Sequence, residues 1–156
     1  MEIRRFQQGD EISLFHVFLS SVRTIAARDY TPEQIEAWAS EDIDKDQWAD
    51  HVRRLQPFVV VADTQIVGYA DVQPNGYMNH FFVSGTHSKQ GIGTLLMNRI
   101  HEEAQRLGIG ALTSNVSKTA EAFYLRHGFH VVDRCLPIRR GVVLQNALMR
   151  KDLINT

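Results

Sequence analysis

Residues 83–97, VSGTHSKQGIGTLLM, join a predicted strand over Asn79–Val83 to a predicted helix through a polar loop that contains glycine. In the helix, apolar side chains recur every three or four positions, which is typical of one buried helix face. Gly91 and Gly93 carry no side chains where the first helical N–H groups lack partners within the helix. These N–H groups and the positive end of the helix dipole favour a bound phosphate or pyrophosphate.

Other phosphate-binding loops fit this stretch less well. A Walker loop needs a lysine and a hydroxyl directly after its last glycine, and Thr94 and Leu95 stand there instead. A Rossmann fingerprint needs a third glycine and an early strand, whereas this loop lies beyond the middle of the chain. The alternative to a phosphate site is a tight strand-to-helix connection in which the glycines serve packing alone.

Two segments of the chain resemble a known family. Residues 88–93, SKQGIG, resemble motif A of the GNAT superfamily of acyl-CoA-dependent N-acetyltransferases, whose pattern is Arg/Gln-x-x-Gly-x-Gly/Ala. Ser88 stands where the pattern has arginine or glutamine, which weakens one side-chain contact and leaves the backbone amides in place. Residues 120–129, AEAFYLRHGF, resemble motif B of the same family. The likeness is strongest over residues 66–130, and the order of elements outside that range agrees with it.

Turn signals and hydrophobic periodicity divide the rest of the chain into elements. Helices are predicted after Asp10 and after Thr31, and over 46–55, 92–107 and 118–127. Strands are predicted over 3–6, 58–62, 66–72, 77–83, 111–115, 129–136 and 142–150, with a hairpin turn at Pro74-Asn75-Gly76. The resemblance implies an α/β fold of the α+β kind, with a mixed central sheet of about six to seven strands flanked by helices. It also implies that this sheet is splayed at the strand that binds acyl-CoA.

Size and composition are those of one globular domain over residues 1–156, with 44% hydrophobic and 22% charged residues. A net charge of -1 gives no basic field for nucleic acid. The amino end has no apolar run of signal-peptide length, and no segment has the length and apolarity of a membrane span. The single cysteine excludes an internal disulfide framework and favours a cytoplasmic location. The sequence is also compatible with a homodimer.

The resemblance implies acetyl-CoA as co-substrate, with its pyrophosphate on the loop and the start of the following helix. The residues expected there are Ser88, Lys89, Gln90, Gly91, Ile92, Gly93 and Thr94. The pantetheine arm is expected along Phe82 and Val83, where a ligand can add to a splayed strand. Asn115, at the end of the next strand, is expected to hydrogen-bond the pantetheine or to hold a water.

Tyr124 falls on the tyrosine of motif B, so the resemblance implies a place near the acyl-CoA sulfur. A phenol is a suitable proton donor to the departing thiolate, because its pKa of about 10 exceeds that of a thiol. The competing interpretation is a tyrosine packed between helix and sheet. The base is less defined by the sequence: His80, on the strand face expected to hold Met78 and Phe82, is the first candidate. Asp71 on the neighbouring strand and a chain of waters are the alternatives.

The acceptor is expected between the early helices and the late hairpin around Arg139 and Arg140, with Tyr30 and Trp38 opposite the two arginines and Asp71 nearby. These side chains favour a small amine with an apolar body, and the arginines can also receive a carboxylate. The scattered histidines and the single cysteine do not form a metal-binding pattern, so no metal is expected. The resemblance implies an acetyl-CoA-dependent N-acetyltransferase acting on a primary amine of a small molecule. The alternative is an acyl-CoA-binding sensor or partner module without turnover.

Overall fold

The computed structural model describes residues 1–40, 42–87 and 90–153. Residues 1–55 contain one strand, three α-helices and a short helical link between the first two of these helices. These elements are β1 (Glu2–Arg5), α1 (Glu11–Ser20), the π-helical turn Ser21–Ile25, the 3-10 turn Ala26–Arg28, α2 (Pro32–Trp38) and α3 (Lys45–Leu55). The predicted helix after Asp10 is therefore α-helical only to Ser20, and a π-helical turn and then a 3-10 turn continue it.

The start of α2 follows the sequence closely. Thr31 accepts a hydrogen bond from the backbone N–H of Gln34, and the Gln34 side chain accepts one from the Thr31 N–H. This reciprocal capping box, with Pro32 at the first helical position, fixes where the helix begins.

The remaining elements are β2 (Phe58–Ala62), β3 (Gln65–Ala70), β4 (Tyr77–Met78), β5 (Phe81–Val83), α4 (Ile92–Leu107), β6 (Ala111–Ser117), α5 (Glu121–Arg126), β7 (His130–Cys135), β8 (Ile138–Arg139), β9 (Val142–Val143) and β10 (Asn146–Asp152).

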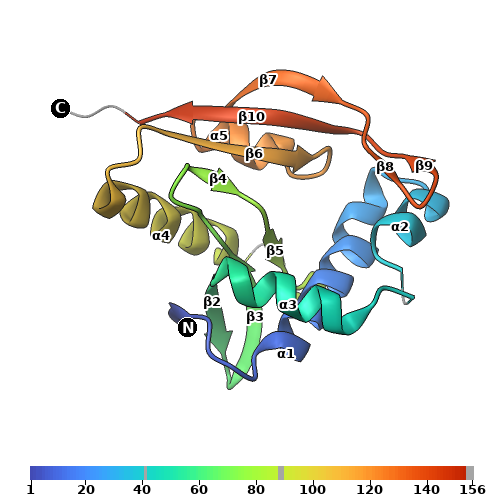
Figure 1. The fold of residues 1–156 in the computed structure, drawn as a ribbon, viewed down its shortest axis with the longest axis horizontal. Helices are drawn as coiled ribbons and strands as arrows, with labels where there is room; N and C mark the ends of the chain where they lie inside the picture. The colour runs from blue at the N-terminus through green and yellow to red at the C-terminus, as the bar shows by residue number, and fades with distance from the viewer. Residues whose placement is uncertain (41, 88–89, 154–156) are drawn as a thin grey trace.

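The strands form two four-stranded sheets, in the orders β1-β2-β3-β5 and β4-β6-β10-β7, and a small β8-β9 ribbon. All pairs are antiparallel except β4 with β6. Figure 1 shows the second sheet across the top of the molecule and β2 and β3 below it, with α4 on one side and α1 to α3 on the other. This confirms the predicted mixed sheet flanked by helices.

The predicted strand over 77–83 is two strands that belong to different sheets. Tyr77 and Met78 pair with β6, whereas residues 81–83 pair with β3. The break falls at Asn79 and His80, whose backbone N–H groups donate to the Asp71 carboxylate at 2.9 and 2.6 Å instead of continuing a ladder. From this point the sheets diverge, which is the splay that the fold prediction requires.

The apolar periodicity of the predicted motif A helix is confirmed by burial. Five apolar side chains of α4 have at most 1% of their surface exposed and join the largest core cluster, namely Ile92, Leu96, Met97, Ile100 and Ala104. Leu107, in the last turn, is 42% exposed and lies outside the core. Across the described ranges, no helix is both long enough and apolar enough to cross a membrane.

Candidate functional site

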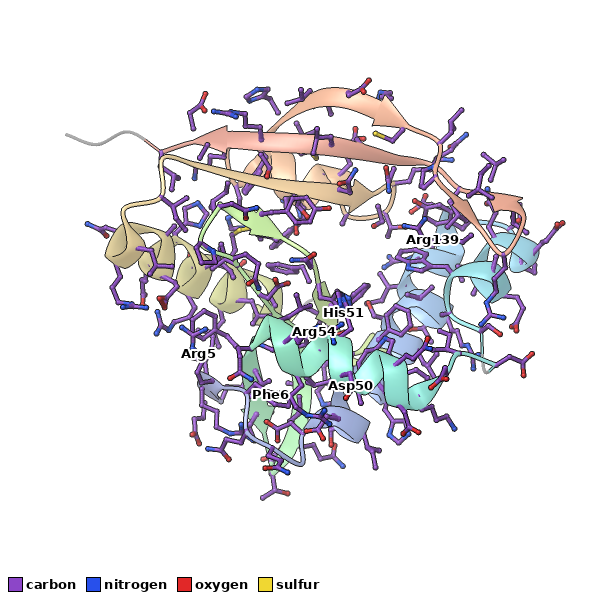
Figure 2. The ribbon with its side chains drawn as sticks, in the orientation of Figure 1. Arg5, Phe6, Asp50, His51, Arg54 and Arg139 are labelled. Atoms are coloured by element: carbon purple, nitrogen blue, oxygen red, sulfur yellow. The ribbon has the colours of Figure 1, made fainter. Side chains whose placement is uncertain are left out.

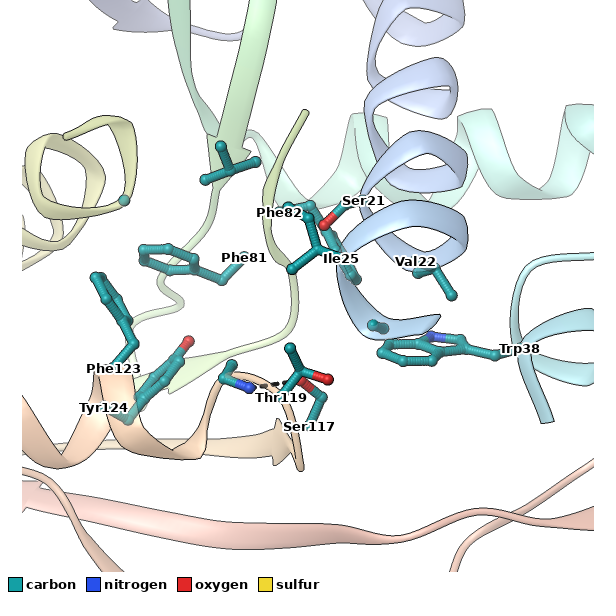
Figure 3. Close-up of a pocket in the computed structure, with 14 residues that line it drawn as sticks. Ser21, Val22, Ile25, Trp38, Phe81, Phe82, Ser117, Thr119, Phe123 and Tyr124 are labelled. Carbon is teal, nitrogen blue, oxygen red and sulfur yellow. Dashed lines mark hydrogen bonds between the residues drawn. The ribbon is translucent and has the colours of Figure 1, made fainter. Parts of the chain in front are cut away.

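A first cavity of about 200 Å³ opens in the splay between β5 and the start of α5 (Figure 3). Its walls are mostly apolar and come from the π-helical turn, α2, β5, α4 and the β6-α5 segment. They include Val22, Ile25, Trp38, Phe81, Phe82, Val83, Gly93, Ser117, Phe123 and Tyr124. Phe82 and Val83, the residues predicted for the pantetheine arm, therefore line this cavity.

Tyr124 lies in the wall of the first cavity, and its hydroxyl points into the space beside Phe81 (Figure 3). The ring is 97% buried and packs edge-on against Phe129, at 5.0 Å between ring centroids. Burial raises the pKa of Tyr124, and the Ser114 hydroxyl opposes that rise. The phenol is therefore protonated over the ordinary pH range and can donate a proton.

The start of α4 offers backbone N–H groups without a side-chain cap. Gly91 precedes the helix at a φ of 80°, in the left-handed region that favours glycine, and a Cβ there would meet nothing within 4 Å. The first helical hydrogen bond runs from Leu95 N–H to Gly91 C=O, so the preceding amides are available to a ligand. Gln90 and Thr94 are exposed beside them. Ser88 and Lys89, predicted for the same site, lie outside the described residues.

Ile92 and Gly93 have structural roles in addition to the one predicted. The Ile92 side chain is 1% exposed in the core, so only its backbone can reach a ligand. A Cβ on Gly93 would lie 3.2 Å from two ring carbons of Phe123. Gly93 therefore permits close packing between α4 and α5 as well as access to the amides. A bulky replacement there disturbs this packing, which makes Gly91 the cleaner position for a test of ligand binding.

A second cavity, of about 350 Å³, lies between the early helices and the second sheet. Trp38, Phe82 and Ser117 line both cavities, so the two spaces are neighbours on either side of these residues. The other lining residues of the second cavity include Phe18, Tyr30, Ile43, Trp48, Tyr77, Asn79, His80, Asn115, Arg139, Leu144 and Asn146. The sequence did not identify Phe18, Trp48, Tyr77 and Asn79 as site residues.

Asn115 lines the second cavity and not the first. Its Oδ1 accepts a hydrogen bond from the Tyr77 hydroxyl at 2.6 Å. The parallel register that sets Tyr77 opposite Thr113 brings these two side chains together. Asn115, expected to hydrogen-bond the pantetheine or to hold a water, therefore borders the second cavity, where its oxygen is bonded to Tyr77.

His80 lines the second cavity within a cluster of rings that includes Phe18, Trp48 and Phe82. Its Nδ1 and the Tyr69 hydroxyl are 2.9 Å apart and share a hydrogen bond. Burial lowers the pKa of His80 to about 3, with a smaller contribution from His51. The imidazole of His80, the first candidate for the base, is therefore neutral at ordinary pH and binds a proton weakly. Met78 does not share its face, because the strand breaks between them.

The low pKa of His80 predicts a specific pH dependence of stability. Between pH 6.5 and about 3 the unfolded state binds a proton that the folded state rejects, so the free energy of unfolding falls as the pH falls. His80→Gln should make the decline from pH 6.5 to 4.5 shallower by up to about 2 kcal/mol. Urea unfolding at several pH values measures this slope, which lost ring contacts alone do not change. Equal slopes in the two proteins would contradict the assignment.

Asp71, an alternative base and expected substrate contact, has a structural role between β4 and β5. Its side chain is 1% exposed and is not part of the described lining of either cavity. Besides the N–H groups of Asn79 and His80, it accepts from Asn79 Nδ2 at 3.1 Å and Gln73 Nε2 at 2.8 Å. Burial raises the pKa of Asp71, and these four donors oppose the rise. The carboxylate holds the break between β4 and β5.

Removal of the Asp71 carboxylate should therefore destabilise the protein. Asp71→Ala leaves two backbone N–H groups without their acceptor, and the free energy of unfolding should fall by about 2–4 kcal/mol. Asp71→Asn retains one acceptor oxygen and should lose less. The control is Asp133→Ala, at an exposed strand position, which should stay within about 0.5 kcal/mol of wild type. Urea titrations of the three variants at one pH would refute this role if Asp71→Ala matched the control.

The early helices and the late hairpin both reach the second cavity, but not through all of the predicted residues. The Tyr30 hydroxyl donates to Gln145 C=O and accepts from Lys118 N–H, so its ring lines the cavity while its oxygen joins the helices to the sheet. Trp38 packs edge-on against Tyr30 at 5.5 Å. Arg140 is exposed in the β8-β9 turn at a φ of 51° and is not part of the described lining. Arg139, the other arginine of this hairpin, lines the cavity.

The chain belongs to the GNAT acetyltransferases, since residues 26–152 match the family model described as Acetyltransferase (GNAT) domain. This confirms the family predicted from the loop at 88–93 and the segment at 120–129. Within the described ranges, no group of three or more His, Cys, Asp or Glu side chains is arranged to hold a metal ion.

Particular relatives match over nearly the whole chain. The uncharacterized N-acetyltransferase YafP of Escherichia coli strain K12 is 29% identical over 150 residues, which cover 96% of this chain and 95% of that protein. A GCN5-related N-acetyltransferase from Rhodopseudomonas palustris superposes with a TM-score of 0.92 at 25% identity, covering 97% and 95% of the two chains. PaiA N-acetyltransferase from Thermoplasma acidophilum, in complex with coenzyme A, superposes with a TM-score of 0.77 at 21% identity over 97% and 98%.

Proposed function

We propose that this chain transfers the acetyl group of acetyl-CoA to the primary amine of a small molecule, by direct attack in a ternary complex. The observation that carries the proposal is that Trp38, Phe82 and Ser117 line two neighbouring cavities, with Tyr124 in the wall of the first. One cavity suits the arm of the donor, and the other leaves room for an acceptor. Direct transfer requires the two reactants to meet at one point.

The donor is expected to bind from the start of α4 to the first cavity. Backbone amides near Gly91 suit the pyrophosphate, because they lack helical partners and lie at the positive end of the helix dipole. No backbone pairing joins β5 to β6 in the described sheets, so the edge of β5 can pair with the amides of the pantetheine. The coenzyme A complex of PaiA supports this choice of donor.

The chemistry that these residues can perform is acyl transfer with proton donation to sulfur. Acetyl-CoA supplies an acetyl group activated as a thioester. As the new C–N bond forms and the C–S bond breaks, the Tyr124 hydroxyl can donate its proton to the departing sulfur. Removal of the proton from the attacking nitrogen is assigned to water, because a pKa of about 3 makes the His80 imidazole a weak base.

Calorimetry and thiol release together test the proposed function. The protein should bind acetyl-CoA and should release CoA thiol faster when a suitable amine is added from a panel of amines, amino acids, polyamines, aminoglycosides and peptide termini. Thiol release without amine gives the background of hydrolysis. Binding of acetyl-CoA with no amine-dependent release across the panel would instead identify an acyl-CoA-binding module.

A further inference from the structure

Five aromatic rings form a continuous series along one side of the second cavity. Trp48 contacts Phe18 at 5.8 Å between ring centroids, and Phe18 contacts Phe82 at 5.1 Å. From Phe82 the series continues to Trp38 at 6.4 Å, and from Trp38 to Tyr30 at 5.5 Å. Trp38, Trp48 and Phe82 are only partly buried, so their surfaces are open to a ligand. A flat aromatic body can pack face-on or edge-on against such a wall.

The charge of the second cavity comes from one side chain. Among the described residues that line it, Arg139 of β8 is the only one with a permanent charge, and none is acidic. Arg139 is labelled in Figure 2. No carboxylate of the described residues lies within ion-pair distance of its guanidinium. Its Nη1 donates only a long bond, at 3.3 Å, to the neighbouring Ile138 carbonyl. The remaining donors of the guanidinium are therefore available to an anionic group.

Arg139 belongs to the polar part of the cavity lining, together with Tyr77 and Asn115. Burial raises the pKa of Tyr77, and the positive charge of Arg139 opposes that rise. Arg139 and Tyr77 line the same cavity, and the Tyr77 hydroxyl donates a hydrogen bond to Asn115. Aromatic surface from the early helices and β5 thus faces a cationic, hydrogen-bonding surface from β4, β6 and β8.

We propose that the second cavity accepts a primary amine with an aromatic body and a carboxylate, the body packing on the five rings and the carboxylate binding Arg139. This inference rests on the proposed function and names its acceptor class. An arginine fork matches a carboxylate in geometry and charge. The cavity volume of about 350 Å³ suits one such small molecule.

Polycationic acceptors fit this cavity poorly. A polyamine or an aminoglycoside needs acidic side chains to pair its ammonium groups, and the described lining provides none. The positive charge of Arg139 also repels such a molecule, which adds discrimination against it. An aliphatic amino acid keeps the carboxylate contact but loses the packing of ring against ring.

A matched set of acceptors tests the inference with the wild-type protein. L-Phenylalanine, L-tyrosine, L-tryptophan and 4-aminobenzoate carry both features, 3-cyclohexyl-L-alanine lacks the aromatic ring, phenethylamine lacks the carboxylate, and spermidine is a polycation. The best of the first four should exceed each of the last three in kcat/KM for acetyl transfer by about 10-fold or more. A higher kcat/KM for spermidine or 3-cyclohexyl-L-alanine than for all four would overturn the inference.

Two neighbouring arginines provide a matched pair of variants. Arg139→Gln should raise the KM of the best aromatic carboxylate by about 10- to 100-fold and should leave that of phenethylamine within about 2-fold. Arg140→Gln, at the exposed turn position outside the lining, should change neither. Equal effects of Arg139→Gln on both acceptors would show that the arginine does not bind the carboxylate.

The outcome also separates this inference from the proposed function. Turnover of amines of another class contradicts the acceptor assignment and leaves the N-acetyltransferase activity standing. Acetyl-CoA binding without turnover of any amine, in this set or in the broad panel, contradicts both.

Discussion

Tyr124→Phe is expected to lower kcat for acetyl transfer by about 10- to 1,000-fold, while the affinity for acetyl-CoA stays close to wild type. The substitution removes one hydroxyl and keeps the ring that packs against Phe81 and Phe129. Because burial keeps this phenol protonated, its loss removes the proton donor from the first cavity. Steady-state kinetics at saturating substrates and calorimetry with acetyl-CoA measure the two quantities.

Tyr77→Phe is the matched control, since it removes a phenol hydroxyl from the second cavity instead. It should act mainly on the acceptor KM, because its hydroxyl bonds Asn115 on the acceptor side. Thermal unfolding checks that both variants are folded. Full kcat in a folded Tyr124→Phe protein would show that Tyr124 is a packing residue.

Gly91→Asp is expected to weaken acetyl-CoA binding by at least about 10-fold relative to Gly91→Asn. Asparagine and aspartate are the residues that best tolerate the left-handed backbone at this position, and they differ in charge but hardly in shape. Any backbone strain is therefore nearly common to both variants. What remains is the repulsion between a carboxylate and the pyrophosphate, which calorimetry at low ionic strength measures directly.

The other end of α4 supplies the control for this pair. Gly108 has a φ of 69°, and a Cβ there also meets nothing within 4 Å. Gly108→Asp and Gly108→Asn should bind acetyl-CoA equally well, because they lie a whole helix away from the proposed pyrophosphate. If Gly91→Asp and Gly91→Asn also bound equally, the pyrophosphate would have to lie elsewhere.

Local patterns predicted the elements that carry the donor side. The spacing of Ile92, Leu96 and Ile100 set the buried face of α4, and Gly91 marked its start, because helical periodicity and a left-handed backbone are properties of neighbouring residues. The turn at residues 74–76 also forms, with Gly76 at a positive φ. Tyr124 was singled out by the family resemblance rather than by any local pattern, and it lines the first cavity.

Long-range contacts decided what the sequence could not predict. Residues 77–83 were predicted as one strand. In the structure the Asp71 side chain accepts the N–H groups of Asn79 and His80, and the strand breaks there. The pKa of His80 depends on rings from α1, α3 and β5 that surround it in space. Arg139 rather than Arg140 faces the cavity because Arg140 and Gly141 both adopt positive φ in a two-residue hairpin turn.

Direct acetyl transfer from a donor in the first cavity to an amine in the second is the central claim. Isotope-labelled acetyl transfer tests it most directly. The protein is mixed with acetyl-CoA labelled in the acetyl group, first alone and then with an accepted amine, and both protein and amine are analysed by mass spectrometry. Direct transfer predicts an unlabelled protein in the absence of amine and the label on the amine nitrogen when both substrates are present. A labelled protein that passes its acetyl group on, or CoA release without any N-acetylated amine, would contradict the account.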